Sequence, residues 1–467
     1  MIKRSLSAIG RWLDDRLGLT SSVMPVIAHP VPRATNWWYV FGSATLVAFT
    51  VQVVTGVALA FTYVPAPNSA YDSLDFITHG AILGSVVRGI HYWGASAMVV
   101  LIFVHMARTF VMGAFKFPRE MNWLTGVALF VLTLGMAFTG QLLRWDQDAY
   151  WAVVVGASQA ARTPLIGDFL ARVLIAGQVV GGATLTRFYA THVFLIPAVM
   201  FGLIAVHLYL IVRHGISEPP RPGHPVDRAT YRQWYEELLH EDGVPFWPDA
   251  AWRDVVFALA IGSVVLLLSI VVGPPELGKQ ADPTIINADP RPDWYFLWYF
   301  AVLALIPPST ESWVIIGFPA LVGLLLIVLP FVAPVGERSP RRRPWAPAIV
   351  VGIVLSIAVL VRMGHDAPWS PVMEPTPFPN TLTAGLGGDQ LRGAQLFQAK
   401  GCNSCHMIAG LGGQRGPDLT AVGSRLSHDE LVWRILNGGT NMPAYGSTLK
   451  PDEVSALVSF LETRTGR

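Results

Sequence analysis

The chain has 467 residues, of which 52% are hydrophobic and only 14% are charged. Globular domains average about 25% charged residues, so this composition supports a membrane protein. The formal net charge of +2 is uninformative, and nothing in the sequence indicates nucleic-acid binding, so no nucleic-acid partner is expected.

The N-terminal segment, residues 1–35, is basic. Residues 1–20 contain no uninterrupted apolar core before a cleavage site, so we expect no removable signal peptide. Apolar residues alternate with arginines between Leu6 and Leu17. This pattern indicates either an amphipathic helix that lies on the cytoplasmic surface or a poorly ordered tail.

Seven long apolar stretches are predicted to span a membrane. In chain order they are Trp37–Thr62, Gly89–Met112, Trp123–Leu143, Phe188–Val212, Val255–Gly273, Trp313–Val335 and Trp345–Val361. An eighth run, Trp294–Ile306, is too short to span and predicts an interfacial or re-entrant helix. The expected fold is therefore an all-α, polytopic transmembrane bundle with a small helical domain at its C-terminal end.

Basic residues predict the orientation of this bundle. The segment before the first span and the loop between the sixth and seventh spans hold Lys3, Arg4, Arg11, Arg16, Arg33, Arg338, Arg341, Arg342 and Arg343. The loop between the first two spans, residues 63–84, has no lysine or arginine. The positive-inside rule then places the N-terminus in the cytoplasm, and seven spans place everything after Val361 on the opposite, positive side.

Two pairs of histidines lie in the second and fourth apolar stretches. His91 and His105 are fourteen residues apart, and His192 and His207 are fifteen apart. In an α-helix these spacings are about 1400° and 1500° of rotation, so each pair faces nearly one way with about 21 Å between its members. Two such helices would hold two bis-histidine b haems, one near each membrane surface. A lone histidine would be a satisfied polar core residue, but the repeated spacing favours ligands.

Glycines repeat the same period in the first and third stretches. Gly42 and Gly56 are fourteen residues apart, as are Gly126 and Gly140. A glycine beside each macrocycle would let the porphyrin approach the backbone, whereas close helix packing is the ordinary alternative. The matching period favours the haem interpretation.

The soluble C-terminal segment carries the only two cysteines of the chain, Cys402 and Cys405, in the sequence Cys-Asn-Ser-Cys-His. This is the motif for covalent attachment of c-type haem, with His406 beneath the iron. A redox or zinc site is the alternative, but no second cysteine pair exists to complete a zinc site. Met442 is the methionine of this domain expected to be the sixth iron ligand.

Several motifs together resemble cytochrome b of the quinol–cytochrome c and quinol–plastocyanin oxidoreductases. They are the four histidines, the segment Leu185–Tyr189, the tripeptide Trp145–Gln147 and the tetrapeptide Pro292–Tyr295. The resemblance covers roughly residues 20–363, and residues 389–464 resemble a class I cytochrome c, so the whole resembles a cytochrome b–c fusion. The fifteen-residue histidine spacing is that of the plastid-type branch and of many bacterial menaquinol enzymes.

The expected organisation therefore has five parts. After the N-terminal segment these are a four-helix di-haem part, a three-helix part, a Pro-rich linker and a cytochrome c domain, at residues 36–213, 214–363, 364–388 and 389–467. The resemblance implies two non-covalent b haems and one covalent c haem. The cysteine that attaches an extra haem in plastid-type proteins is Val40 here, so that haem is not expected.

The pairing in the family implies that His91 and His192 hold the haem nearer the positive side. His105 and His207 would hold the haem nearer the cytoplasm. The expected topology gives the same answer, because the second and fourth spans both descend from the positive side. Three arginines close to these histidines would pair with haem propionates, or are ordinary arginines at membrane-span ends: Arg88, Arg108 and Arg187.

The resemblance also implies quinol oxidation on the positive side. The family's Pro-Glu-Trp-Tyr motif is Pro-Asp-Trp-Tyr here, so Asp293, next to Tyr295, is the expected proton acceptor. Asp293 also suits a helix N-cap, and both roles are compatible. One electron would pass to a Rieske protein and then to haem c. The other would cross through the b haems to a cytoplasmic-side quinone site, coupled to proton translocation; Arg213 and His214 are candidate residues of that site.

Both cysteines are used by haem c, so a separate Rieske iron–sulfur subunit is expected. The other implied partners are a quinol, a second copy of the complex, and a downstream cytochrome c, oxidase or reaction centre. The resemblance favours menaquinol, while the residues themselves leave ubiquinol and plastoquinol open. The expected location is the bacterial cytoplasmic membrane, with the cytochrome c domain outside. A di-haem anchor of a dehydrogenase and a tethered electron carrier without quinol chemistry remain as alternative functions.

Overall fold

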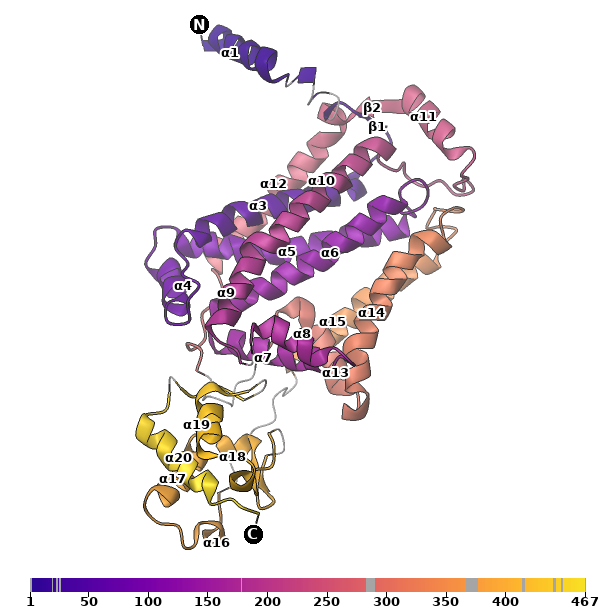
Figure 1. Ribbon diagram of the computed structural model, residues 1–467. Helices are drawn as coiled ribbons and strands as arrows, with labels where there is room; N and C mark the ends of the chain where they lie inside the picture. Colours follow the sequence, from indigo (N-terminus) through magenta and orange to yellow (C-terminus); the bar gives the residue numbers. More distant parts are fainter. Residues whose placement is uncertain are drawn as a thin grey trace.

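The computed structural model describes residues 2–466 except 19, 22–23, 25–26, 178, 283–289, 367–376, 414–415, 440–441 and 447, and only the backbone of residues 2–9 and 308–309. This part of the chain is helical apart from two small antiparallel sheets. They pair β1 (Pro30–Pro32) with β2 (Gly243–Pro245), and β3 (Met407–Ile408) with β4 (Leu411–Gly412). The expected all-α class is confirmed (Figure 1). The middle of the expected linker lies outside the described residues.

Seven helical runs in the described part are long and apolar enough to cross a membrane. They are α3 (Phe41–Ala60), α5 (Gly84–Val111), α6 (Glu120–Gln141), α9 (Gly182–Ala190) continued by α10 (Ile196–His214), α12 (Ala251–Val271), α14 (Pro308–Val332) and α15 (Trp345–Asp366). They correspond to the seven predicted spans with shifted ends, and the last helix continues past the predicted Val361. The short eighth run is also helical, as α13 (Trp294–Leu305), and its interfacial or re-entrant position stays a prediction.

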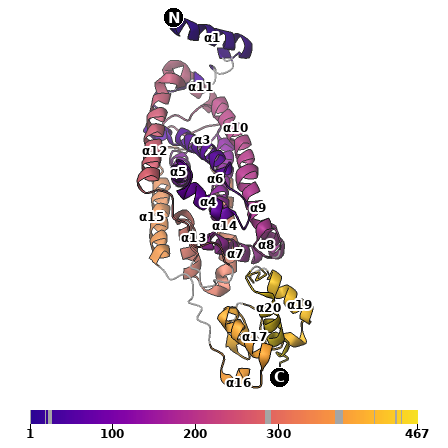
Figure 2. The ribbon, with the colours of Figure 1, turned by 90° about the vertical axis from the view of Figure 1, so that its left-hand side faces the viewer.

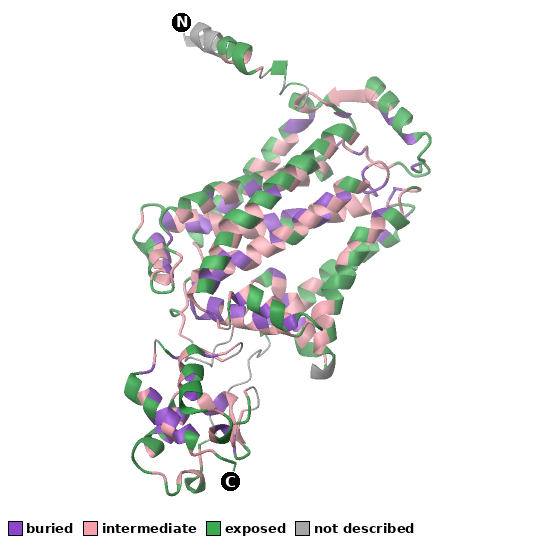
Figure 3. Cartoon of the chain, in the orientation of Figure 1, coloured by how far each residue is buried: buried purple, intermediate pink, exposed green. Residues whose placement is uncertain are grey.

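The outer faces of these helices remain apolar where no other helix covers them. Figure 3 shows exposed residues along α10 and α14, with buried residues gathered between the helices. Exposed Leu324, Leu325 and Phe331 on α14 are typical. Such a helix is stable only in lipid, where its backbone groups are satisfied internally and its side chains meet hydrocarbon. The chain is therefore a multi-pass membrane protein.

Two helix pairs form the inner bundle. Helix α3 packs against α5, and α6 packs against α10. Their shared core includes Ala48, Phe49, Met98, Leu101 and Met200, all buried. Helix α12 covers α3 and α5, α14 lies against α6, and α13 lies against α15. The histidine-bearing helices α5 and α10 thus each pack against a glycine-bearing helix, α3 and α6 respectively.

A π-helical turn, Thr191–Leu195, joins α9 to α10 and contains His192. The amide of Ile196 donates to the carbonyl of Thr191, a bond over five residues rather than four. A π-turn accommodates one extra residue within a continuous helix. The fifteen-residue spacing from His192 to His207 therefore acts as a fourteen-residue spacing, and both histidine pairs present their side chains with the same rotation.

The two ends of the bundle carry different short helices. At one end lie α1 (Ile2–Leu17) and α11 (Tyr231–Asp242), as Figures 1 and 2 both show. At the other end lie α4 (Ala70–His79), α7 (Gln147–Ala161), α8 (Gly167–Ile175) and α13, beside the C-terminal domain. Because α1 is helical, the structure supports an amphipathic helix in the N-terminal segment over a poorly ordered tail. The sidedness relative to the cytoplasm stays a prediction.

The C-terminal domain is a small helical unit with its own core. Its helices are α16 (Asn380–Thr383), α17 (Gly388–Ala399), α18 (Cys402–Cys405), α19 (His428–Asn437) and α20 (Pro451–Glu462). The rings of Phe397 and Phe460 lie 5.7 Å apart where α17 crosses α20. A Cβ on Gly393 would lie 2.0 Å from the carbonyl oxygen of Ala456. Only glycine permits this close crossing.

Candidate functional site

The structure brings His91 of α5 and His192 of the π-turn together. Their ring centroids lie 6.3 Å apart. Metal–imidazole nitrogen bonds are about 2 Å long, so two imidazoles on opposite sides of one metal ion have centroids about 6 Å apart. The observed separation therefore fits a shared iron. It supports the predicted pairing of these two histidines.

Each glycine of the two predicted pairs faces one of the four histidines. A Cβ built on the glycine would lie within 4 Å of an imidazole atom in every case: 3.0 Å for Gly42 and His105, 3.2 Å for Gly56 and His91, 3.7 Å for Gly126 and His207, and 2.6 Å for Gly140 and His192. The nearest atoms belong to imidazole rings and not to a neighbouring helix backbone. Each glycine therefore lets one histidine ring approach its helix backbone closely, and the predicted role of the glycines beside a porphyrin stays a prediction.

Three threonines that the sequence interpretation missed also contact these histidines. Their hydroxyl groups lie at hydrogen-bond distance from ring Nδ1 atoms: Thr55 and His91 at 2.9 Å, Thr125 and His207 at 2.8 Å, and Thr139 and His192 at 3.1 Å. Each threonine directly precedes the glycine that faces the same histidine. The repeated Thr-Gly dipeptide was the available signal.

The three predicted arginines differ in what they contact. The guanidinium of Arg108 stacks over the ring of Tyr39 at 3.7 Å, and its buried Nε and Nη2 have no hydrogen-bond partner among the described residues. Buried guanidinium donors normally have partners, so this group is suited to an anion such as a haem propionate. Arg88 instead donates to Thr78 and to the carbonyl of Pro275, and Arg187 donates to a carbonyl on α8. Propionate contacts of these two arginines stay predictions.

The predicted attachment site for haem c lies on the short helix α18. Past its end, Nδ1 of His406 donates to the carbonyl of Pro417 at 2.8 Å, which leaves Nε2 free as a ligand. A Cβ on Gly416 would lie 2.5 Å from this ring, so only glycine fits beside it. Burial lowers the pKa of His406, which keeps the imidazole neutral as iron binding requires.

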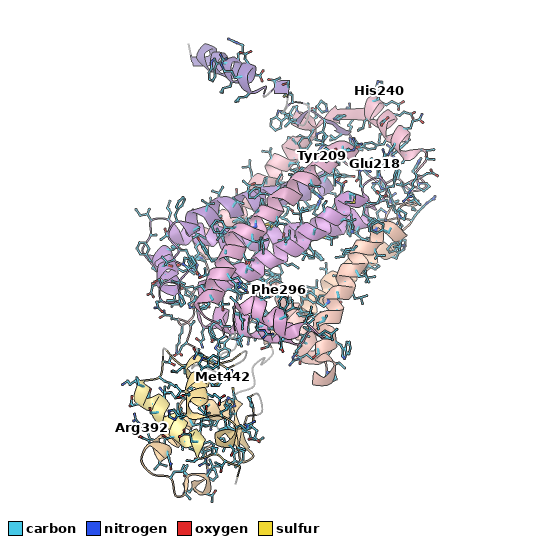
Figure 4. All side chains as sticks on the ribbon, viewed as in Figure 1. Tyr209, Glu218, His240, Phe296, Arg392 and Met442 are labelled. Atoms are coloured by element: carbon cyan, nitrogen blue, oxygen red, sulfur yellow. The ribbon has the colours of Figure 1, made fainter. Side chains whose placement is uncertain are left out.

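Met442, the predicted sixth ligand, lies in the part of the C-terminal domain that is nearer to the helical bundle (Figure 4). It follows Gly438 and Gly439, whose backbone closes a turn through the bond from the amide of Gly439 to the carbonyl of Met442. The residues present, two cysteines, a histidine with fixed tautomer and a turn-borne methionine, fit a c-type haem. The role of Met442 stays a prediction.

Asp293 directly precedes α13 at the end of the bundle nearer the C-terminal domain, where Figure 4 labels Phe296. Its side chain makes no capping hydrogen bond to α13. Instead, the hydroxyl of Tyr295 donates to a carboxylate oxygen of Asp293 at 2.6 Å. Burial raises the pKa of Asp293, against the opposing effects of the Tyr295 hydroxyl and the charge of Arg144. The cap interpretation therefore does not account for this side chain.

The surroundings of Asp293 connect it to the first histidine pair. Trp294 donates from Nε1 to the hydroxyl of Ser96 on α5 at 3.5 Å, five residues beyond His91. Arg144, which ends the 3-10 turn Leu142–Arg144 after α6, is near enough to Asp293 for its charge to lower the pKa of the carboxyl group. The carboxylate therefore lies near the start of the segment 144–187 and near the histidine-bearing helix α5.

Arg213 and His214 end α10 at the opposite end of the bundle, where Figure 4 labels Tyr209 and Glu218. The carbonyl of His214 accepts a hydrogen bond of 3.1 Å from the buried Arg119. No described contact assigns either side chain to a ligand. Their predicted role at a second quinone site stays a prediction.

Comparison with known proteins agrees with this geometry. The family model for cytochrome b/b6/petB matches residues 26–215, the model for cytochrome b(C-terminal)/b6/petD matches residues 280–377, and the model for cytochrome C oxidase, cbb3-type, subunit III matches residues 388–461. These matches define a membrane cytochrome with b-type and c-type haem domains. The chain belongs to the cytochrome b/b6 family and carries a C-terminal cytochrome c domain, as the sequence predicted.

Relatives from bacteria support the assignment. Cytochrome b6 of Heliobacterium modesticaldum is 43% identical over 210 residues, which are 44% of this chain and 99% of that protein. The menaquinol:cytochrome c reductase cytochrome b subunit of Bacillus subtilis is 42% identical over 223 residues, 46% of this chain and 99% of that protein. Cytochrome b of Rhodobacter capsulatus is 32% identical over 66% of this chain and 70% of that protein. A solved structure described as a hyperthermophilic respiratory Complex III is similar to this chain with a TM-score of 0.65 and 27% identity. The match covers 77% of this chain and 91% of the chain in that structure.

Proposed function

We propose that this chain is the cytochrome b–c subunit of a menaquinol–cytochrome c oxidoreductase, a complex that oxidises quinol on the side of the membrane where Asp293 lies. One observation carries the proposal: a half-buried carboxylate, hydrogen-bonded by Tyr295, directly precedes a tryptophan that contacts the helix bearing His91. Related proteins support the substrate, because two are named menaquinol:cytochrome c reductase cytochrome b subunits. The complex would include a separate Rieske protein, a second copy of this chain and a downstream electron acceptor in the bacterial cytoplasmic membrane.

The residues that would hold three haems are those already described. His91 with His192 and His105 with His207 would each bind one b haem, and Cys402 and Cys405 would attach haem c between His406 and Met442. Bound there, the haems and the Rieske cluster would supply the one-electron acceptors between which the two quinol electrons divide, coupling quinol oxidation to proton translocation.

Asp293 would take one of the two protons that quinol releases. Its pKa is raised by burial, so the carboxyl group holds a proton more strongly than an exposed aspartate does. The hydroxyl of Tyr295 donates to Oδ2 and so holds the carboxylate in place, and Oδ1 would be the oxygen that accepts the quinol proton. Arg144 favours the ionised form and so promotes release of the proton toward solvent.

The variant Asp293→Asn tests this proposal. It should retain all three haems, because the amide is nearly isosteric and α13 does not depend on a cap from this side chain. Quinol-driven reduction of haem c, followed by stopped flow in a complex that retains its Rieske subunit, should fall about 10²-fold, as for loss of one positioned acid–base group. Asp293→Glu should keep substantial activity.

The matched control is Asp75→Asn. Asp75 lies at the same end of the bundle on α4 and is half exposed in an ion pair with His79. This control should turn over at the wild-type rate. An Asp293→Asn complex as fast as the Asp75→Asn complex would refute the proton-acceptor role and favour a tethered electron carrier without quinol chemistry of its own.

A further inference from the structure

Arg144 carries a positive charge at the edge of the proposed quinol site. It ends the 3-10 turn that follows α6, and its side chain is 22% exposed. Its charge acts on Asp293 and on Tyr92 of α5, the residue after His91. The guanidinium therefore lies near both the proposed proton acceptor and the helix that bears His91.

Two long hydrogen bonds hold the residues that flank Asp293. On one side, Gln141 at the end of α6 donates from its side chain to the carbonyl of Arg291 at 3.5 Å. On the other side, Trp294 donates to the hydroxyl of Ser96 on α5 at 3.5 Å. The segment that bears Asp293 is thus fastened to the same end of α6 from which the guanidinium projects.

A buried carboxylate fixes the position of this guanidinium. Trp145 has a φ of +49°, in the left-handed region, and the side chains on either side of it, Arg144 and Asp146, form an ion pair. The side chain of Asp146 is fully buried, and it also accepts hydrogen bonds from the amides of Ala149 and Gly278 at 3.0 and 3.1 Å. Asp146 is therefore held by two segments of backbone, and it holds Arg144 in turn.

Both described side-chain hydrogen bonds of Arg144 use a single nitrogen. Nη2 donates to Asp146 and, at 3.3 Å, to the carbonyl of Glu276. Nε is buried and has no partner within the described part of the chain. Buried guanidinium donors normally have partners, and an anionic oxygen makes the strongest one. Arg144 is therefore fixed in place and still able to bind an oxygen atom.

Proton transfer from quinol to Asp293 moves a negative charge within this cluster. The O–H bond of quinol breaks, the proton forms a bond to Oδ1 of Asp293, and the electron pair stays on the quinol oxygen, which leaves the quinol monoanion. The other charged groups near the guanidinium, Arg88 and Asp146, keep their charges in this step. A fixed cation near both oxygens stabilises the new anion without reorganisation.

We propose that Arg144 is a substrate-binding residue of the quinol site, and that it stabilises the quinol monoanion formed when Asp293 takes the first proton. The site would then prefer an anionic ligand to a neutral one once Asp293 carries its proton. This inference rests on the proposed function, since it takes Asp293 as the proton acceptor. The alternative is a clasp that only fastens the end of α6 to residues 276–278, and it predicts no preference for anions.

The test is ligand binding to the whole complex with Asp293→Asn, whose amide stands for the protonated carboxyl group. The probes are an alkyl hydroxynaphthoquinone, at a pH where its hydroxyl group is ionised, and its methyl ether, which stays neutral. Calorimetry should show that the anion binds about tenfold more tightly than the ether, as for a hydrogen bond between charged groups. Adding Arg144→Gln should remove this preference, whereas Arg144→Lys keeps the charge and should retain part of it.

Arg172→Gln is the matched control. Arg172 is exposed on α8 at the same end of the bundle, and its described hydrogen bond goes to the carbonyl of Asp168. Added to the Asp293→Asn complex, it should leave the preference for the anion intact. An equal preference after Arg144→Gln and after Arg172→Gln would overturn the inference. Tighter binding of the ether than of the anion by the Asp293→Asn complex would also overturn it, and this result requires no variant of Arg144 to fold.

These outcomes are distinct from failure of the proposed function, because binding is measured without turnover. A complex that binds neither probe would count against the function itself. An Asp293→Asn variant that oxidises quinol at the wild-type rate would do the same.

Discussion

At the residue scale, the carboxyl group of Asp293 is governed by opposing effects. Burial raises its pKa, whereas the hydroxyl of Tyr295 and the charge of Arg144 lower it. The net pKa lies above the ordinary aspartate value of about 3.9. A proton acceptor with a raised pKa is already protonated at low pH and becomes competent only as pH rises through that pKa.

This sign gives a prediction for the pH dependence. The rate of quinol-driven reduction of haem c should rise with pH through the pKa of Asp293, which gives the pH–rate profile a rising limb. Tyr295→Phe removes a hydrogen bond that stabilises the carboxylate, so the limb should move to higher pH. Stopped-flow rates across pH 5–9 measure this, and a limb that moves to lower pH or persists in Asp293→Asn would assign it to another group.

Gly140 gives a prediction about haem binding. An added Cβ would lie 2.6 Å from the ring of His192, so Gly140→Ala should displace that imidazole and selectively reduce the b haem shared with His91. Gly202→Ala on α10 is the control, because nothing lies within 4 Å of its Cβ position. Pyridine haemochrome analysis and redox titration should show the loss in the first variant alone. Equal haem content in both would leave Gly140 as a packing residue.

The histidine and glycine periods could be predicted from the sequence because a helix converts residue spacing directly into direction. The threonine contacts were missed, since a threonine in an apolar helix ordinarily bonds to its own backbone. The second bond, from the imidazole, depends on a neighbouring helix. The difference between Arg108 and Arg88 also depends on tertiary contacts, here with the carbonyl of Pro275.

At the element scale, hydropathy predicted the seven spans because their side chains face lipid or other apolar helices. The ends moved by several residues where helices continue into interfacial segments, as α15 does to Asp366. The π-turn Thr191–Leu195 was not predictable from spacing alone. A fifteen-residue interval fits either a rotated α-helical pair or a helix with one extra residue, and only the bond from Ile196 to Thr191 distinguishes them.

The crossing of α17 and α20 gives a prediction for the cytochrome c domain. Gly393→Ala would place a Cβ 2.0 Å from the carbonyl oxygen of Ala456, which forces the helices apart and opens the core around Phe460. Attachment of haem c should fall several-fold while both b haems remain. Gly387→Ala, with nothing within 4 Å of its Cβ position, is the control. Haem-stained gels measure covalent haem, and normal staining of the Gly393 variant would contradict the prediction.

At the scale of the whole molecule, the chain joins a membrane helix bundle to a C-terminal cytochrome c domain, which lies at one end of the bundle. The C-terminal domain lies beside α7, α8 and α13 in both ribbon views, at the end that holds Asp293 (Figures 1 and 2). The N-terminal helix α1 lies at the other end. This arrangement agrees with an N-terminus in the cytoplasm and a cytochrome c domain outside, which remain proposals for the cell.

The most direct test of the central claim is a single-turnover experiment. Reduced menaquinol analogue is mixed with the oxidised complex, and the absorbance of haem c and of the b haems is followed together. The account predicts that both haem types become reduced, and that removal of the Rieske subunit abolishes reduction of haem c by quinol. Reduction of the b haems alone in the intact complex, or full reduction of haem c without the Rieske subunit, would contradict it.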